Sequence, residues 1–141
     1  MPNSETNHLV AEKEEGYARS TILVVEDEEI SYLLVQEILS AYPAINVMRA
    51  NNGIEAQKFL SKHHKQVSLV LMDIKMPLLN GYETTRWIKE YFSLPVVALT
   101  AFVHQNSIEK CKECGCDDML MKPFDLNHFL KIVKRYCRQI S

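Results

Sequence analysis

Hydrophobic and polar positions along the chain alternate between short apolar runs and longer amphipathic stretches. The run ILVV comes after Thr21, and the stretch EDEEISYLLVQEILSAY follows it. Within that stretch apolar residues recur at the three- and four-residue spacing of a helix: Ile30, Leu33, Leu34, Ile38 and Leu39. The first unit therefore predicts a buried strand followed by a helix.

The same alternation repeats four more times. Further strands are predicted at 45–50, 67–72, 94–100 and 117–121, and further helices at 52–64, 82–92, 104–114 and 125–137. Parallel strands need crossover connections, which are right-handed, and the continuous apolar runs indicate burial on both faces. The pattern predicts an α/β fold, a doubly wound five-stranded parallel sheet with five helices. Ligands of such sheets bind beyond the carboxyl ends of the strands.

The first twenty residues differ from the rest. They are polar, and we expect residues 1–20 to form a flexible N-terminal arm and residues 21–141 to form one domain. The arm carries Glu5 and lacks the apolar segment of a secretory signal, and no apolar run is long enough to span a membrane. We therefore expect a cytoplasmic protein.

The overall charge is slightly negative. The chain has 16 basic and 18 acidic residues, a formal net charge of -2, so it lacks the strongly basic composition typical of nucleic-acid binding and we expect no direct nucleic-acid partner. Its four cysteines include Cys111, Cys114 and Cys116 in the stretch CKECGC, which could indicate a metal site or a redox pair, but a zinc site would need further matched ligands. We expect reduced thiols on a helix that runs into a turn.

Polar residues that could take part in catalysis or metal binding follow the apolar runs. Glu26 and Asp27 follow the first strand, Asp73 the third, Thr100 the fourth and Lys122 the fifth. Carboxylates that lie close together raise one another's pKa unless a cation neutralises them, and oxygen ligands alone favour Mg²⁺, with Mn²⁺ as the second choice. Because Mg²⁺ commonly accompanies phosphate, the set indicates a phosphoryl site with Asp73 as the nucleophile.

Each of these residues also has an ordinary structural interpretation. Asp27 could cap the following helix, and Asp73 could form a turn ahead of Pro77. Thr100 alone is typical of a strand end, and Lys122 alone is typical of a solvated surface. Their joint placement at four strand ends favours the functional interpretation.

The set resembles the receiver domain of two-component response regulators over Thr21 to about Cys137. The residues that carry this resemblance are Glu26-Asp27, Asp73 with its D-x-x-M-P motif, Gly81, Thr100-Ala101 and Lys122-Pro123. The resemblance implies a flavodoxin-like fold with strand order 2-1-3-4-5. It also implies that Gly81 permits a close approach between the loop after Asp73 and the next helix, and that the Lys122-Pro123 bond is cis.

The resemblance further implies a signalling phosphoacceptor that assists its own Mg²⁺-dependent phosphorylation and dephosphorylation and is not an enzyme. Asp73 would accept a phosphoryl group from a phosphohistidine of a histidine kinase or histidine phosphotransfer protein. Asp27, Asp73 and the backbone carbonyl of Lys75 would hold Mg²⁺, while Glu26 would act through water. Similar domains occur as stand-alone regulators and within hybrid histidine kinases, and their output passes through a downstream protein partner.

By the same resemblance Thr100 and Lys122 would contact phosphoryl oxygens, and Ala101 and Met119 would belong to the switch. Met119 stands where related proteins usually carry an aromatic residue, so the output surface between Cys111 and Lys134 would respond differently. Lys75 and Phe102 would flank the path of attacking water.

Two alternatives remain open. The first is a pseudo-receiver, a protein-interaction module that works without phosphorylation, and Met119 favours it. The second is a flavin-binding domain of the same topology, which the acidic stretch VEDEE disfavours because it would repel a phosphate in the absence of a metal.

Overall fold

A five-stranded parallel sheet forms the centre of the computed structural model, which describes residues 20–75, 80–101 and 105–137. The strand order β2-β1-β3-β4-β5 and the parallel pairing confirm the expected fold. The strands are β1 (Ser20–Val25), β2 (Ile45–Ala50), β3 (Val67–Asp73), β4 (Val96–Thr100) and β5 (Asp118–Met121). Except for Ser20, the predicted arm lies outside the described residues, as do Met76, Pro77 and Phe102.

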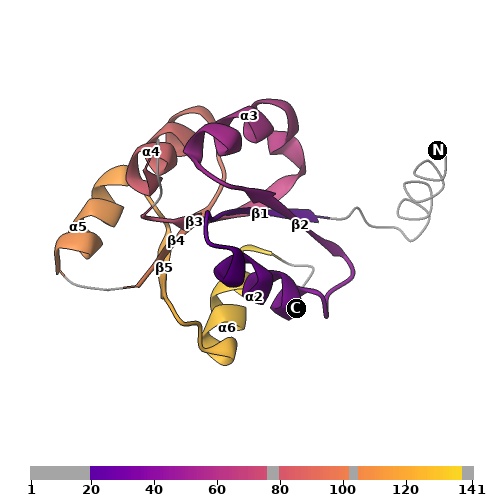
Figure 1. The fold of residues 1–141 in the computed structure, drawn as a ribbon. Coiled ribbons are helices and arrows are strands. Elements are labelled where there is room, and N and C mark those ends of the chain that lie inside the picture. The colour runs from indigo at the N-terminus through magenta and orange to yellow at the C-terminus, as the bar shows by residue number, and fades with distance from the viewer. Residues whose placement is uncertain (1–19, 76–79, 102–104, 138–141) are drawn as a thin grey trace.

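Helices cover both faces of this sheet (Figure 1). They are α2 (Glu29–Leu39), α3 (Gly53–His63), α4 (Gly81–Tyr91), α5 (Gln105–Cys114) and α6 (Leu126–Tyr136), and a short 3₁₀ turn, η1 (His64–Gln66), precedes β3. Helices α2 and α6 pack on one face, and α3 and α4 pack on the other. No helix among the described residues has both the length and the apolar character needed to cross a membrane.

The side chains of β1 show why the predicted alternation produces two cores. Ile22 and Val24 point into the core shared with α2 and α6, whereas Leu23 and Val25 point into the core shared with α3 and α4. All four are 0% exposed, and burying such a side chain stabilises the fold by about 2 kcal/mol. Burial on both faces explains the continuous apolar runs of the sequence.

Helix α2 buries a narrower face than its apolar spacing suggests. Val35 and Leu39 are buried, but Ile30 remains 79% exposed, and Leu33 and Leu34 are also exposed. The helix begins at Glu29 with Glu28 as its N-cap residue, so the alternative role of Asp27 as the cap is wrong. Asp27 instead lies in the loop that joins β1 to α2, at the carboxyl edge of the sheet.

Candidate functional site

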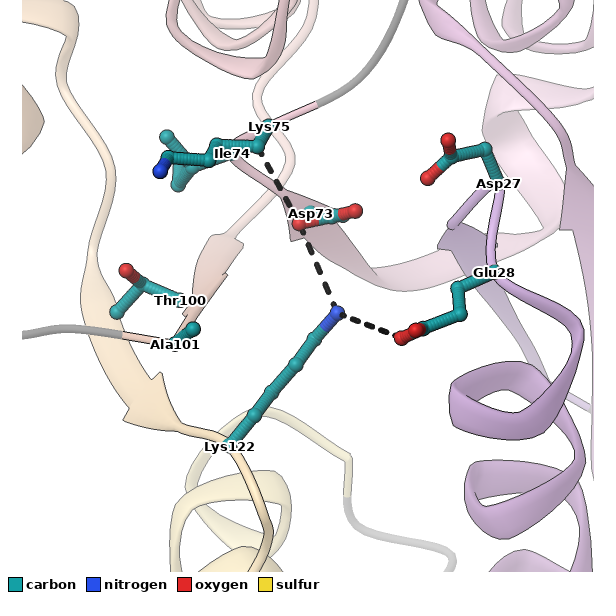
Figure 2. Close-up of a pocket in the computed structure, with 8 residues that line it drawn as sticks. All are labelled: Asp27, Glu28, Asp73, Ile74, Lys75, Thr100, Ala101 and Lys122. Carbon is teal, nitrogen blue, oxygen red and sulfur yellow. Dashed lines mark hydrogen bonds and ion pairs between the residues drawn. The ribbon is translucent and has the colours of Figure 1, made fainter.

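The carboxyl ends of the central strands surround a pocket of about 480 Å³ (Figure 2). The loop after β1 and the ends of β3, β4 and β5 contribute the residues that line it: Asp27, Glu28, Asp73, Ile74, Lys75, Thr100, Ala101 and Lys122. Figure 2 shows Asp73 at the centre, with Lys122 reaching towards it and Asp27 opposite Thr100. The parallel sheet thus brings together residues that are far apart in the sequence.

Three carboxylates form the acidic part of the site. One oxygen from each of Glu26, Asp27 and Asp73 lies within 4.8 Å of the others. Glu26 is 1% exposed and does not line the pocket, whereas Asp27 lines the pocket and is exposed. A set made only of carboxylate oxygens, partly buried and open on one side to a pocket, fits a hard divalent cation such as Mg²⁺.

The protonation of Asp73 reflects its crowded position. Burial raises the pKa of Asp73 to about 8, and the hydrogen bond to Glu26 and its negative charge act in the same direction. The ammonium group of Lys122 and the backbone N–H of Lys75, which lies 3.3 Å from Oδ1 of Asp73, oppose this shift. Without a cation the site therefore retains a proton at neutral pH.

Lys122 places a positive charge directly beside the carboxylates of the site. Its Nζ lies 2.8 Å from Oε1 of Glu26, 3.7 Å from Oδ1 of Asp73 and 4.0 Å from Oε1 of Glu28. Burial by itself would lower the pKa of Lys122, but the hydrogen bond to Glu26 and the three negative charges raise it. The backbone of Lys122 donates a 2.8 Å hydrogen bond to the carbonyl of Thr100, and the Lys122-Pro123 bond is cis, as expected.

Gly81 fixes the distance between β3 and α4. A Cβ atom at this position would lie 2.4 Å from the carbonyl oxygen of Asp73 and 2.7 Å from Cα of Ile74. The backbone N–H of Gly81 donates a 3.1 Å hydrogen bond to the carbonyl of Ile74. The expected close approach is therefore confirmed, and it explains why a glycine is needed beside Asp73.

Three residues near the site were not identified from the sequence: Glu28, Ile74 and Arg49. Glu28 lines the pocket, and its place in the acidic run after β1 could have indicated this. Arg49 donates from Nε to the carbonyl of Glu26 at 3.1 Å, forms a 2.5 Å ion pair with Glu29 and lies over the ring of Tyr32. Arg49 therefore fixes the acidic loop, a role that no local sequence signal reveals.

The expected switch residues occupy two different environments. Thr100 and Ala101 line the pocket at the end of β4, where Figure 2 shows them beside Lys122. Met119 lies in β5 next to Ala98 and packs against the core cluster of Ile74, Ala98 and Cys111. Met119 does not line the pocket, but it packs against the cluster that contains the lining residue Ile74.

Comparisons with known proteins agree with this geometry. The sequence profile described as "Response regulator receiver domain" matches residues 22–134. The polar-differentiation response regulator DivK of Brucella ovis is 32% identical over 119 residues, which cover 82% of this chain and 94% of DivK.

Solved structures extend the comparison. The receiver domain of the sensor histidine kinase PA1611 from Pseudomonas aeruginosa, which has magnesium coordinated in its active-site cleft, gives a TM-score of 0.73 at 31% identity, covering 84% of this chain and 98% of that one. The co-crystal structure of the Saccharomyces cerevisiae histidine phosphotransfer protein Ypd1 with the receiver domain of Ssk1 gives a TM-score of 0.77 at 27% identity. The match covers 88% of this chain and 93% of that one.

Proposed function

The chain belongs to the response regulator receiver domain family, and from this premise we propose that Asp73 accepts a phosphoryl group from a phosphohistidine. The observation that carries the proposal is the convergence of the three carboxylates and the ammonium group of Lys122 on one pocket. This combination suits a carboxylate nucleophile, which needs neutralisation of charge more than it needs a general base.

In the proposed transfer, an oxygen of the ionised Asp73 carboxylate attacks phosphorus, and a P–O bond forms as the P–N bond to the donor imidazole breaks. The electron pair of the broken bond returns to the ring nitrogen, and because the other ring nitrogen of the donor carries a proton, the ring leaves as neutral imidazole. Lys122 stabilises the charge of the transferring oxygens, because its Nζ is held 3.7 Å from Oδ1 of Asp73. Thr100, which lines the same pocket, hydrogen-bonds another phosphoryl oxygen.

The oxygen donors of the pocket suit Mg²⁺, with Mn²⁺ as a substitute. Asp27, Asp73 and the backbone carbonyl of Lys75 would hold the ion, and Glu26 would act through water because it is buried and does not line the pocket. Bound there, the cation would neutralise negative charge on the carboxylates and on the incoming phosphoryl group.

Phosphorylation would then shift the equilibrium between two conformations of a protein-binding surface. A phosphoryl group on Asp73 would draw Thr100 and Lys122 inwards, and Ala101 would follow as the neighbour of Thr100. Met119 would shift in response, because it packs against Ile74 and Ala98. A downstream protein partner would bind one of the two states.

The phosphoryl donor is proposed to be a histidine kinase or a histidine phosphotransfer protein. Helix α2 starts at the pocket, and its side chains Ile30, Leu33 and Leu34 are 79%, 46% and 41% exposed. An apolar surface of this kind beside the phosphoacceptor suits docking of a protein donor. The relation to the Ypd1–Ssk1 complex supports the same donor class.

Intact-protein mass spectrometry after incubation with acetyl phosphate and Mg²⁺ tests the proposal. We expect one added phosphoryl group on the wild type and none on Asp73→Asn or in the presence of EDTA. Asp125→Asn is a matched control that should be modified normally, because Asp125 caps α6 by accepting a hydrogen bond from the backbone of His128.

An unmodified wild type that also fails to bind BeF₃⁻ would contradict the proposal. That result would favour the alternative function, a pseudo-receiver whose partner surface does not depend on phosphorylation.

A further inference from the structure

The C-terminus of α5 brings two cysteines together through its backbone. Gly115 adopts a φ of +91°, and its N–H donates to the carbonyls of Cys111 and Lys112 at 3.0 and 3.2 Å. The N–H of Cys116 donates to the carbonyl of Cys111 at 3.0 Å. These bonds form a Schellman cap, in which the residue after the glycine packs against a residue of the last helical turn. Here those two residues are Cys116 and Cys111.

The side chains complete a compact thiol cluster, which we define as Cys111, Cys114 and Cys116. Cys116 packs against the core that contains Cys111, and its thiol interacts with both other thiols. The Sγ of Cys114 donates to the carbonyl of Cys111 at 3.3 Å. Cys111 and Cys114 are 2% and 3% exposed, whereas Cys116 is half-buried and is the most accessible of the three.

Hydrogen bonding within the thiol cluster lowers the pKa of two of its three cysteines. The hydrogen bond from Cys116 lowers the pKa of Cys111 and also lowers that of Cys114, to about 7, with help from the positive charge of Arg86. The pKa of Cys116 is raised, because its proton is shared with the two other thiols. A thiolate beside a thiol is the reactive arrangement of a redox pair.

We propose that Cys111 and Cys116 form a reversible disulfide when the protein meets a hydroperoxide. One sulfur of this pair attacks a peroxide oxygen as the thiolate, the O–O bond breaks, and the leaving oxygen departs as water after taking up a proton. The sulfenic acid formed on that cysteine is then attacked by the sulfur of the other. The S–S bond forms as the S–O bond breaks, and a second water carries away the thiol proton.

In the balanced reaction two thiols lose two electrons and one hydrogen peroxide becomes two waters. The backbone favours this pair, because the Schellman hydrogen bonds already hold residues 111 and 116 together. Closing the bond therefore costs little additional chain entropy. The structure confirms the expected placement of these cysteines on a helix that runs into a turn.

Peptide mapping tests the disulfide without reference to phosphorylation. The reduced full-length protein is treated with hydrogen peroxide, free thiols are blocked with iodoacetamide, and the chain is cut with trypsin. Cleavage after Lys110 and Lys112 releases Cys111 in a dipeptide, so a bond to Cys116 appears as a cross-link between two peptides. Fragmentation then distinguishes Cys116 from Cys114 within the longer peptide.

We expect a link between Cys111 and Cys116 that is lost with dithiothreitol and is absent from Cys111→Ser and Cys116→Ser. It should persist in Cys137→Ser, a matched control because Cys137 is equally buried but belongs to the core under α2 and α6. A link between Cys114 and Cys116, or sulfinic acid on one cysteine without any link, would overturn the proposal. Mapping of the wild type decides between these outcomes even if a variant fails to fold.

Discussion

The raised pKa of Asp73 predicts that Mg²⁺ binding depends strongly on pH. Burial and the neighbouring Glu26 raise this pKa to about 8, so below pH 8 the metal-free site carries a proton that a divalent cation must displace. The affinity for Mg²⁺ should therefore rise with pH and level off above the pKa of Asp73.

The size of the pH effect on Mg²⁺ affinity follows from the release of one proton for each ion bound. With a pKa of about 8, the ionised fraction of Asp73 increases about tenfold per pH unit well below that value, and it increases about fiftyfold between pH 6 and pH 8. The apparent association constant for Mg²⁺ should increase by the same factor. Above pH 9 any further gain should be less than about twofold.

Isothermal titration calorimetry measures this linkage directly. Titrations at pH 6, 7, 8 and 9 give the affinity, and repetition in buffers of different ionisation enthalpy gives the number of protons released. We expect about one proton per Mg²⁺ at pH 6.5 and close to none at pH 9.5. An affinity that stays constant from pH 6 to pH 8, with no proton release, would refute the reasoning.

Three substitutions probe the surroundings of the site. Gly81→Ala should lower the free energy of unfolding by about 3 kcal/mol in urea denaturation, because its Cβ would overlap the carbonyl of Asp73; unchanged stability would contradict that packing. Arg49→Met should weaken Mg²⁺ binding about tenfold in calorimetry, since Arg49 holds the carbonyl of Glu26, while exposed Arg86→Met should leave it unchanged. Asp73→Asn should stabilise the metal-free protein at pH 8 by at least about 1.4 kcal/mol and have little effect near pH 4. The sign follows because the pKa of Asp73 is higher in the folded protein, about 8, than its unfolded value of 3.8, so its carboxyl lowers the free energy of unfolding as the pH rises between these values. Equal effects of the substitution at both pH values would contradict this reasoning.

Much of the fold could be predicted because the relevant signals are local. Continuous apolar runs such as 22–25 and 69–72 can be buried only on both faces of a sheet, and the helical stretches between them require parallel strands. The buried face of helix α2 was less predictable. Its apolar spacing continues through Ile30 and Leu33, but whether a first-turn side chain reaches the core depends on the tertiary position of the helix, which the spacing does not contain.

The candidate site also contains some residues that could be predicted from the sequence and others that could not. Asp27, Asp73, Thr100 and Lys122 could be identified because parallel strands deliver their carboxyl ends to one edge of the sheet. The contact of Arg49 with the carbonyl of Glu26 could not be identified, because it depends on the pairing of β1 with β2 and on a side-chain rotamer. The thiol cluster is an intermediate case, since Gly115 indicates a helix end but the proximity of the thiols depends on its cap geometry.

The most direct test of the central claim is to locate the phosphoryl group after acetyl phosphate treatment. Borohydride reduction converts an aspartyl phosphate to homoserine, and tandem mass spectrometry of the peptide containing residue 73 then identifies the modified position. The proposed function predicts homoserine at position 73 in the Mg²⁺-treated wild type and unmodified Asp73 after EDTA. Homoserine at Asp27 or elsewhere, or none at any position, would contradict it.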